Sequence, residues 1–211
     1  MRRLLPFAAA AVCCLAPHAP AHGQQPAPAG KAAPAPAVTL EPAKAVDEKL
    51  FAREQREIGG KVFRLSEYRG RVFVVNVWAT WCGPCWLEIP GFNKVYEDYS
   101  PRGVEFVGLT MNDPTNDADK VLSAARELKM KYRLAWLDYP TAEALMGTRK
   151  VIPQTFVVGA DGRVVLHVRG YNPRVPEMIR AAVSGALARR PGAAAPTPPP
   201  AAAPASAAPR P

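Results

Sequence analysis

Cysteine and histidine are scarce: this sequence of 211 residues contains only four cysteines and three histidines. Cys13 and Cys14 lie in the apolar N-terminal segment, so the remaining chain holds a single pair, Cys82 and Cys85. A structural zinc site takes four ligands, usually two cysteine pairs or one such pair with two histidines. Because the segment expected to fold adds only His167, we expect no bound metal and no cofactor other than a Cys82–Cys85 disulfide.

The sequence also lacks an apolar run long enough to cross a membrane as one helix, which takes about 20 residues. Its N-terminal apolar run, Leu4 to Ala16, is shorter, follows two arginines and precedes Ala19-Pro20-Ala21. This pattern is typical of a signal peptide and predicts export to the periplasm or another extracytoplasmic compartment. The alternatives are an uncleaved membrane anchor and lipid attachment at Cys13 or Cys14.

Basic residues are spread along the chain, and proline is concentrated near its ends. The net charge of +9 comes without a block of Lys and Arg interleaved with aromatic residues, so nucleic acid is not an expected partner. Alanine- and proline-rich stretches bury too little surface to offset the entropy of ordering. We therefore expect a signal peptide over 1–21, an Ala/Pro-rich linker over 22–40, one folded domain over 41–190 and a disordered tail over 191–211.

Alternating strand and helix patterns predict an α/β fold for this domain. Arg71–Ala79 is a nearly continuous run of β-branched and aromatic residues, which is typical of a central strand buried on both faces. Apolar residues at helical spacing follow from Trp86 to Tyr99, so a helix begins within the cysteine motif. This order predicts a mixed sheet flanked by helices. Further strands are expected at 61–65, 104–110, 134–137, 154–158 and 163–169, and further helices at 118–131 (capped by Asp117), 142–146 and 175–187.

The run Trp81-Cys82-Gly83-Pro84-Cys85 lies between the carboxyl end of the central strand and the start of the next helix, where chemistry tends to occur in open α/β sheets. The thiolate is the reactive form of cysteine, and a helix N-terminus favours negative charge. We therefore expect Cys82 to be accessible and to attack a substrate disulfide, while Cys85 lies beneath it and resolves the mixed disulfide. Pro84 lacks an N–H donor, which favours a reductant, and Trp81 is expected to flank the sulfur.

Glu88 is the third expected catalytic residue. It follows Cys85 by three residues, so both side chains lie on one face of a helix. A partly buried carboxylate beside two sulfurs would have a raised pKa and could carry protons for Cys85. The alternative is an ordinary solvated glutamate.

The residues from Leu65 to Cys85, continuing through Glu88-Ile89-Pro90, resemble the thioredoxin superfamily and, more narrowly, its exported TlpA/ResA-type thiol–disulfide oxidoreductases. A second match is Val151-Ile152-Pro153-Gln154-Thr155-Phe156. The resemblance implies a thioredoxin-like fold with a central αβ insert. It also implies that Pro153 is a cis-proline facing the disulfide and that Ile152 offers its backbone to an extended substrate. The residues alone do not predict the cis bond, because few X-Pro bonds are cis.

The resemblance also assigns Glu88 to the family's active-site glutamate and places Asn76 where thioredoxin has a buried aspartate. Val151 and Gln154, beside the expected substrate groove, depart from the family's usual residues. We expect a monomeric enzyme that reduces disulfides of exported proteins and is recharged by a membrane thiol electron donor, as in cytochrome c biogenesis. The alternatives are an oxidase or isomerase, and a copper or apocytochrome chaperone that uses the dithiol without turnover.

Overall fold

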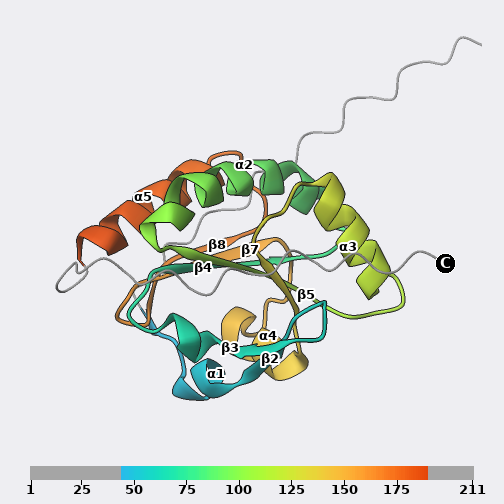
Figure 1. Ribbon diagram of the computed structural model, residues 1–211, viewed down its shortest axis with the longest axis horizontal. Helices are drawn as coiled ribbons and strands as arrows, with labels where there is room; N and C mark the ends of the chain where they lie inside the picture. The colour runs from blue at the N-terminus through green and yellow to red at the C-terminus, as the bar shows by residue number, and fades with distance from the viewer. Residues whose placement is uncertain (1–43, 190–211) are drawn as a thin grey trace, which may run out of the picture. The chain divides into compact units, whose positions relative to one another are not determined.

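The computed structural model of the protein describes residues 44–189 (Figure 1). These residues lie within the segment 41–190 that the sequence predicts to fold. The predicted signal peptide, linker and tail lie outside the described residues.

A six-stranded mixed sheet forms the centre of the fold, with strand order β1-β8-β7-β4-β5-β6. β4, β5 and β6 are parallel, whereas β7 and β8 are antiparallel to their neighbours. β4 is central because β-branched and aromatic side chains suit a strand covered on both faces, and all six of its residues are buried. The strands of this sheet are β1 Lys44–Ala45, β4 Phe73–Trp78, β5 Glu105–Thr110, β6 Arg133–Trp136, β7 Gln154–Val158 and β8 Arg163–Arg169.

Other elements cover both faces of the sheet (Figure 1). One face carries the helices α2 Gly83–Tyr99, α3 Ala118–Glu127 and α5 Val175–Ala188. The opposite face carries α1 Glu48–Ala52, α4 Tyr139–Met146 and a small hairpin of β2 Glu54–Arg56 and β3 Val62–Arg64. Two short 3-10 helices, η1 Leu65–Tyr68 and η2 Ser100–Arg102, complete the described elements.

The two faces of the sheet support separate apolar cores, because successive side chains of a strand point to opposite sides. Val74 of β4 packs in one core with Phe92 of α2 and Ile179 of α5. Val75 and Val77 pack in the other core, which includes residues of α1 and α4. This alternation determines which side chains of β4 face α2. Because the cysteine motif joins β4 to α2, it also determines where that motif lies.

The mixed sheet flanked by helices confirms the predicted α/β class, with differences at element ends. The helix expected at 118–131 is shorter: it ends at Glu127, and Lys129 has a left-handed backbone with φ 56°. Its predicted cap is confirmed, since the Asp117 side chain accepts from the backbone N–H of Lys120 at 3.0 Å. The helix expected at 142–146 begins earlier, at Tyr139, where Asp138 caps it. β1, α1, β2 and η1 are not predicted by the sequence patterns.

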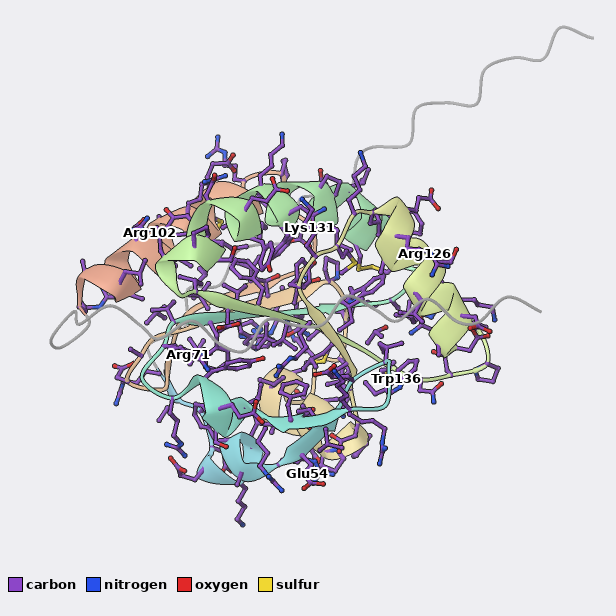
Figure 2. All side chains as sticks on the ribbon, in the orientation of Figure 1. Glu54, Arg71, Arg102, Arg126, Lys131 and Trp136 are labelled. Atoms are coloured by element: carbon purple, nitrogen blue, oxygen red, sulfur yellow. A yellow bond between two sulfur atoms is a disulfide. The ribbon has the colours of Figure 1, made fainter. Side chains whose placement is uncertain are left out.

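Charged side chains lie at the periphery of the domain. Arg102, Arg126 and Lys131 are exposed, as Figure 2 shows. Arg71 is different, because it forms a half-buried ion pair of 2.8 Å with Glu105 where β4 and β5 begin. No helix among residues 44–189 is long and apolar enough to cross a membrane.

Candidate active site

The cysteine motif lies where β4 ends and α2 begins. Cys82 is the N-cap of α2, and its Sγ accepts a hydrogen bond from the backbone N–H of Cys85 at 3.3 Å. Pro84 lies in the first turn of the helix, where its missing N–H costs no intrahelical bond. The predicted helix start within the motif is therefore confirmed.

Cys82 and Cys85 are joined by a disulfide, with their Cα atoms 5.3 Å apart. Cys85 is completely buried, and Cys82 keeps 4% of its surface exposed. The order of exposure agrees with the prediction, but Cys82 is far less accessible than expected because Trp78, Ala79 and Ile152 pack in the same apolar cluster. In this oxidised form Cys82 is nearly covered.

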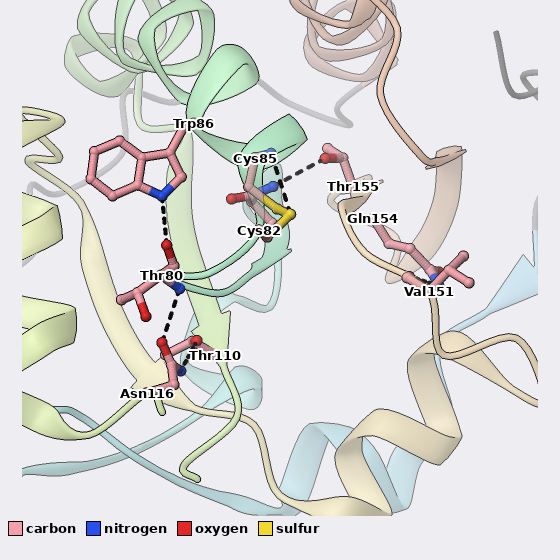
Figure 3. Close-up of a disulfide and its surroundings, with 10 residues drawn as sticks. Thr80, Cys82, Cys85, Trp86, Thr110, Asn116, Val151, Gln154 and Thr155 are labelled. Carbon is pink, nitrogen blue, oxygen red and sulfur yellow. Dashed lines mark hydrogen bonds between the residues drawn. A yellow bond between two sulfur atoms is a disulfide. The ribbon is translucent and has the colours of Figure 1, made fainter. Parts of the chain in front are cut away.

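A buried asparagine fixes the segment that leads into the motif (Figure 3). Asn116, fully buried, accepts from the backbone N–H of Thr80 at 2.9 Å and donates to Thr110 Oγ1 at 2.7 Å. On the other side, the indole N–H of Trp86 donates to the carbonyl of Thr80 at 2.8 Å. Sequence analysis missed Asn116, which is one of several polar residues in a turn-rich stretch.

Glu88 lies one helical turn after Cys85 and is almost completely buried, with 3% of its surface exposed. The interpretation as a solvated glutamate is therefore wrong. Its Oε2 atom makes no hydrogen bond within the described residues. Burial raises the pKa of Glu88 to about 8, because a carboxylate loses its hydration there. A carboxyl group that titrates near neutral pH thus lies on the same helix face as Cys85.

The peptide bond between Ile152 and Pro153 is cis, as the resemblance implies. Ile152 packs against the apolar cluster that contains both cysteines. In Figure 3 the backbone leads from Val151 to Gln154, where β7 begins, and Thr155 is drawn nearer to the cysteines than Val151. Val151 and Trp81, with 58% and 52% of their surface exposed, remain open to contact with another molecule.

An apolar pocket opens next to this segment. It is lined by Val77, Trp78, Ala79, Met111, Leu137, Ala142, Met146, Lys150 and Ile152. No group of three or more His, Cys, Asp or Glu side chains within residues 44–189 is arranged to hold a metal ion. The site thus holds two bonded sulfurs, a buried carboxyl one helical turn further along α2, and a partly apolar surface beside Ile152.

Asn76 and Gln154 are buried polar residues of neighbouring strands beside the motif. The Asn76 amide donates to Thr155 Oγ1 at 3.4 Å, and its Oδ1 has no hydrogen bond within the described part of the chain. Gln154 donates to two carbonyl oxygens of the preceding loop. Sequence analysis noted Gln154 only as a departure from a family pattern, because its partners depend on the loop conformation.

Comparisons with known proteins agree with this geometry. The AhpC/TSA family model matches residues 33–167, more than half of the chain. Thiol-disulfide oxidoreductase ResA of Bacillus thuringiensis (strain Al Hakam) is 32% identical over 120 residues, which are 54% of this chain and 64% of that protein. The chain thus matches less than two thirds of the length of this curated relative.

Two solved structures share the fold. A thiol:disulfide interchange protein of the thioredoxin family from Chlorobium tepidum TLS is 26% identical, with a TM-score of 0.56 over 72% of this chain and 97% of that one. A secreted Mycobacterium tuberculosis disulfide oxidoreductase is 17% identical, with a TM-score of 0.54 over 66% and 99%. These similarities confirm the predicted thioredoxin-like fold.

Proposed function

The chain belongs to the AhpC/TSA family, and from its site we propose that it is a thiol–disulfide oxidoreductase that reduces disulfides of extracytoplasmic proteins. The observation that supports this most directly is the asymmetry of the cysteine pair. Cys82 caps α2 and accepts a backbone N–H, whereas Cys85 is completely buried and bonded to it. This asymmetry supports our assignment of the attack to Cys82 and of the resolving step to Cys85.

In the reduced enzyme, the Cys82 thiolate attacks one sulfur of a substrate disulfide. The substrate S–S bond breaks, the first substrate thiol leaves, and a mixed disulfide joins Cys82 to the second. Cys85 then loses its proton and attacks the Cys82 sulfur, which releases the second substrate thiol and forms the Cys82–Cys85 disulfide. The substrate gains two electrons from the two cysteines, one proton from Cys85 and one proton from the solvent, and the cysteines become oxidised to the disulfide.

Glu88 carries protons for the resolving step. Its raised pKa of about 8 lies close to that of a free thiol, about 8.5, so proton exchange between the two groups has little energetic cost. As the carboxylate it takes the Cys85 proton, and as the acid it returns a proton to a leaving thiolate. Its burial on the Cys85 face of α2 supports this assignment.

The substrate is proposed to bind as an extended segment across the disulfide. The backbone of Ile152 next to Pro153 would pair with it by β-augmentation, and exposed Trp81 would contact its side chains. The apolar pocket beside Ile152 suits an apolar residue of the substrate. We assign all three residues to substrate binding on this basis.

The direction of electron flow and the cellular setting complete the proposal. Pro84 removes one N–H that would stabilise a thiolate at the helix start, which favours a reductant recharged by a membrane thiol donor. The N-terminal signal pattern supports export to the periplasm, and a solved structure with the same fold is described as secreted. Mass spectrometry of the exported chain tests cleavage after Ala21; an intact N-terminus would instead support a membrane anchor.

Reduction of insulin with dithiothreitol as electron source tests the activity. Wild-type protein and a Lys94→Ala control on the exposed face of α2 should both be active, whereas Cys82→Ser should be inactive. A redox titration should give a potential near that of thioredoxin, about −270 mV, and a value near −120 mV would instead indicate an oxidase.

Stoichiometric Cu(I) binding without disulfide turnover would favour a copper chaperone.

A further inference from the structure

Gln154 is the first residue after the cis-proline, and only 1% of its surface is exposed. Within this buried site, both the nitrogen and the oxygen of its side-chain amide form hydrogen bonds. Its Nε2 donates to the carbonyl of Arg149 at 2.7 Å and to that of Val151 at 2.8 Å. Its Oε1 lies 2.8 Å from Nε2 of His167 in the neighbouring strand β8. One buried amide thus links the loop before Pro153 to the interior of the sheet.

These contacts determine which ring nitrogen of His167 carries a proton. The two carbonyls accept, so they must face the Gln154 NH₂ group, and the remaining amide oxygen can only accept as well. His167 Nε2 must therefore carry a hydrogen and donate it to Gln154 Oε1. Apart from the shorter asparagine, no neutral side chain supplies two N–H donors on one nitrogen together with a carbonyl acceptor.

The histidine is held firmly enough to act as the anchor of this link. His167 keeps only 6% of its surface exposed and stacks on Phe156, with ring centroids 4.0 Å apart and planes 25° from parallel. The two residues are also opposite each other in the β7–β8 register. A backbone bond of 2.7 Å from the N–H of Gly170 to the carbonyl of Pro153 joins the same loop to the end of β8.

We propose that Gln154 and His167 form a positioning pair that sets the backbone of residues 149–152 for binding an extended protein substrate. This inference rests on the proposed disulfide reductase activity. Val151 is exposed and Ile152 packs against the cluster that contains both cysteines, so a shift of this loop moves the substrate relative to the disulfide. Small disulfides need no such binding surface and should react independently of the pair.

Matched variants separate the hydrogen bonds from packing. Gln154→Met keeps the length of the side chain and loses every hydrogen bond, and His167→Phe keeps the ring against Phe156 and loses the donor. His167→Gln retains a side-chain N–H and serves as the conservative rescue. Val183→Ala, at a fully buried position of α5 in the other core, controls for a general loss of stability.

Two measurements test the pair. Gln154→Met and His167→Phe should raise the KM for insulin about tenfold, as expected for a lost net hydrogen bond of roughly 1.4 kcal/mol, with kcat within about twofold. Their single-turnover rates with dithiobis(nitrobenzoate) should stay at the wild-type value, and His167→Gln should recover most of the affinity for insulin. Hydrogen exchange of the Gly170 amide, which donates to the Pro153 carbonyl at the end of this loop, should accelerate about tenfold in both variants but not in Val183→Ala.

Unchanged exchange of the Gly170 amide in both variants would overturn the inference, as would equal losses with insulin and the small disulfide. The exchange measurement needs no catalytic activity. If the wild-type protein failed to reduce insulin, the proposed function would be wrong. The exchange result would still show whether the pair holds the loop in place.

Discussion

The backbone N–H of Cys85 donates to the Sγ of Cys82 at 3.3 Å, so the residue proposed to resolve the mixed disulfide also supplies a donor to the sulfur proposed to attack. This contact lies at the N-terminus of α2, a helix of 17 residues. The unpaired N–H groups and dipole of a helix start favour an anion. Both effects act on Cys82 and neither on the buried side chain of Cys85.

The reduced protein should therefore react through Cys82 first. With limiting iodoacetamide at pH 7, we expect Cys82 to be alkylated at least about tenfold faster than Cys85, because the thiolate is the nucleophile. Peptide mapping by mass spectrometry gives the two rates. Equal rates, or faster labelling of Cys85, would contradict the assigned roles.

The burial of Glu88 makes the stability of the oxidised protein depend on pH. Its pKa is raised from an ordinary 4.5 to about 8, so the folded state binds this proton more tightly than the unfolded chain. Its contribution to stability is complete below about pH 4.5 and is lost as the pH rises through 8. The slope from this group reaches at most about 1.4 kcal/mol per pH unit.

Glu88→Gln should remove that dependence. Urea unfolding of the oxidised proteins should give similar stabilities at pH 5, and at pH 8.5 the variant should be more stable by an amount on the order of 3 kcal/mol. Parallel pH profiles for the two proteins would show that the carboxyl is not buried as described. The same variant should slow insulin reduction without abolishing it.

Asn116 is expected to matter for stability although it lies outside the motif. Asn116→Ala would leave the partly buried N–H of Thr80 without its acceptor, which costs about 1–3 kcal/mol. Asn112→Ala, at an exposed asparagine of the same stretch, is the matched control and should cost less than about 0.5 kcal/mol. Equal effects of the two changes in urea unfolding would count against this contact.

The close approach of α2 and α5 gives another prediction. A Cβ added at Gly91 would lie 2.4 Å from Cγ of Pro176 in α5. Gly91→Ala should therefore destabilise the protein by about 1–3 kcal/mol, although alanine is the better helix former by about 1 kcal/mol. Adding Pro176→Ala should recover most of the loss in thermal unfolding; a stabilised single variant would show that the helices are further apart.

The sequence predicts the central part of the fold well because its patterns there are local. The apolar run of β4 and the helical spacing after Cys85 each indicate their own structure, and Gln154–Val158 is predicted to the residue. The short elements are missed because they lack such patterns. β2 reads Glu-Gln-Arg, and it is a strand only because it pairs with β3.

Some residues of the site were likewise predictable from local sequence patterns, and others were not. The cysteines and Glu88 are found by spacing along one helix, and Pro153 by its place in a longer resemblance. Asn116 and Gln154 could not be found, because their partners are set by loop conformation and strand register. His167 enters the sequence analysis only as the one histidine of the folded segment, and only the structure shows that it contacts Gln154 diagonally across β7 and β8.

The most direct test of dithiol exchange is the mixed disulfide itself. Reduced Cys85→Ser protein, mixed with insulin and quenched with acid, should accumulate a covalent adduct that dithiothreitol releases and that peptide mapping places at Cys82. Cys82→Ser should form far less of any adduct. Absence of the Cys82 adduct, or an equal yield through Cys85 in the Cys82→Ser protein, would contradict the proposed reductase mechanism.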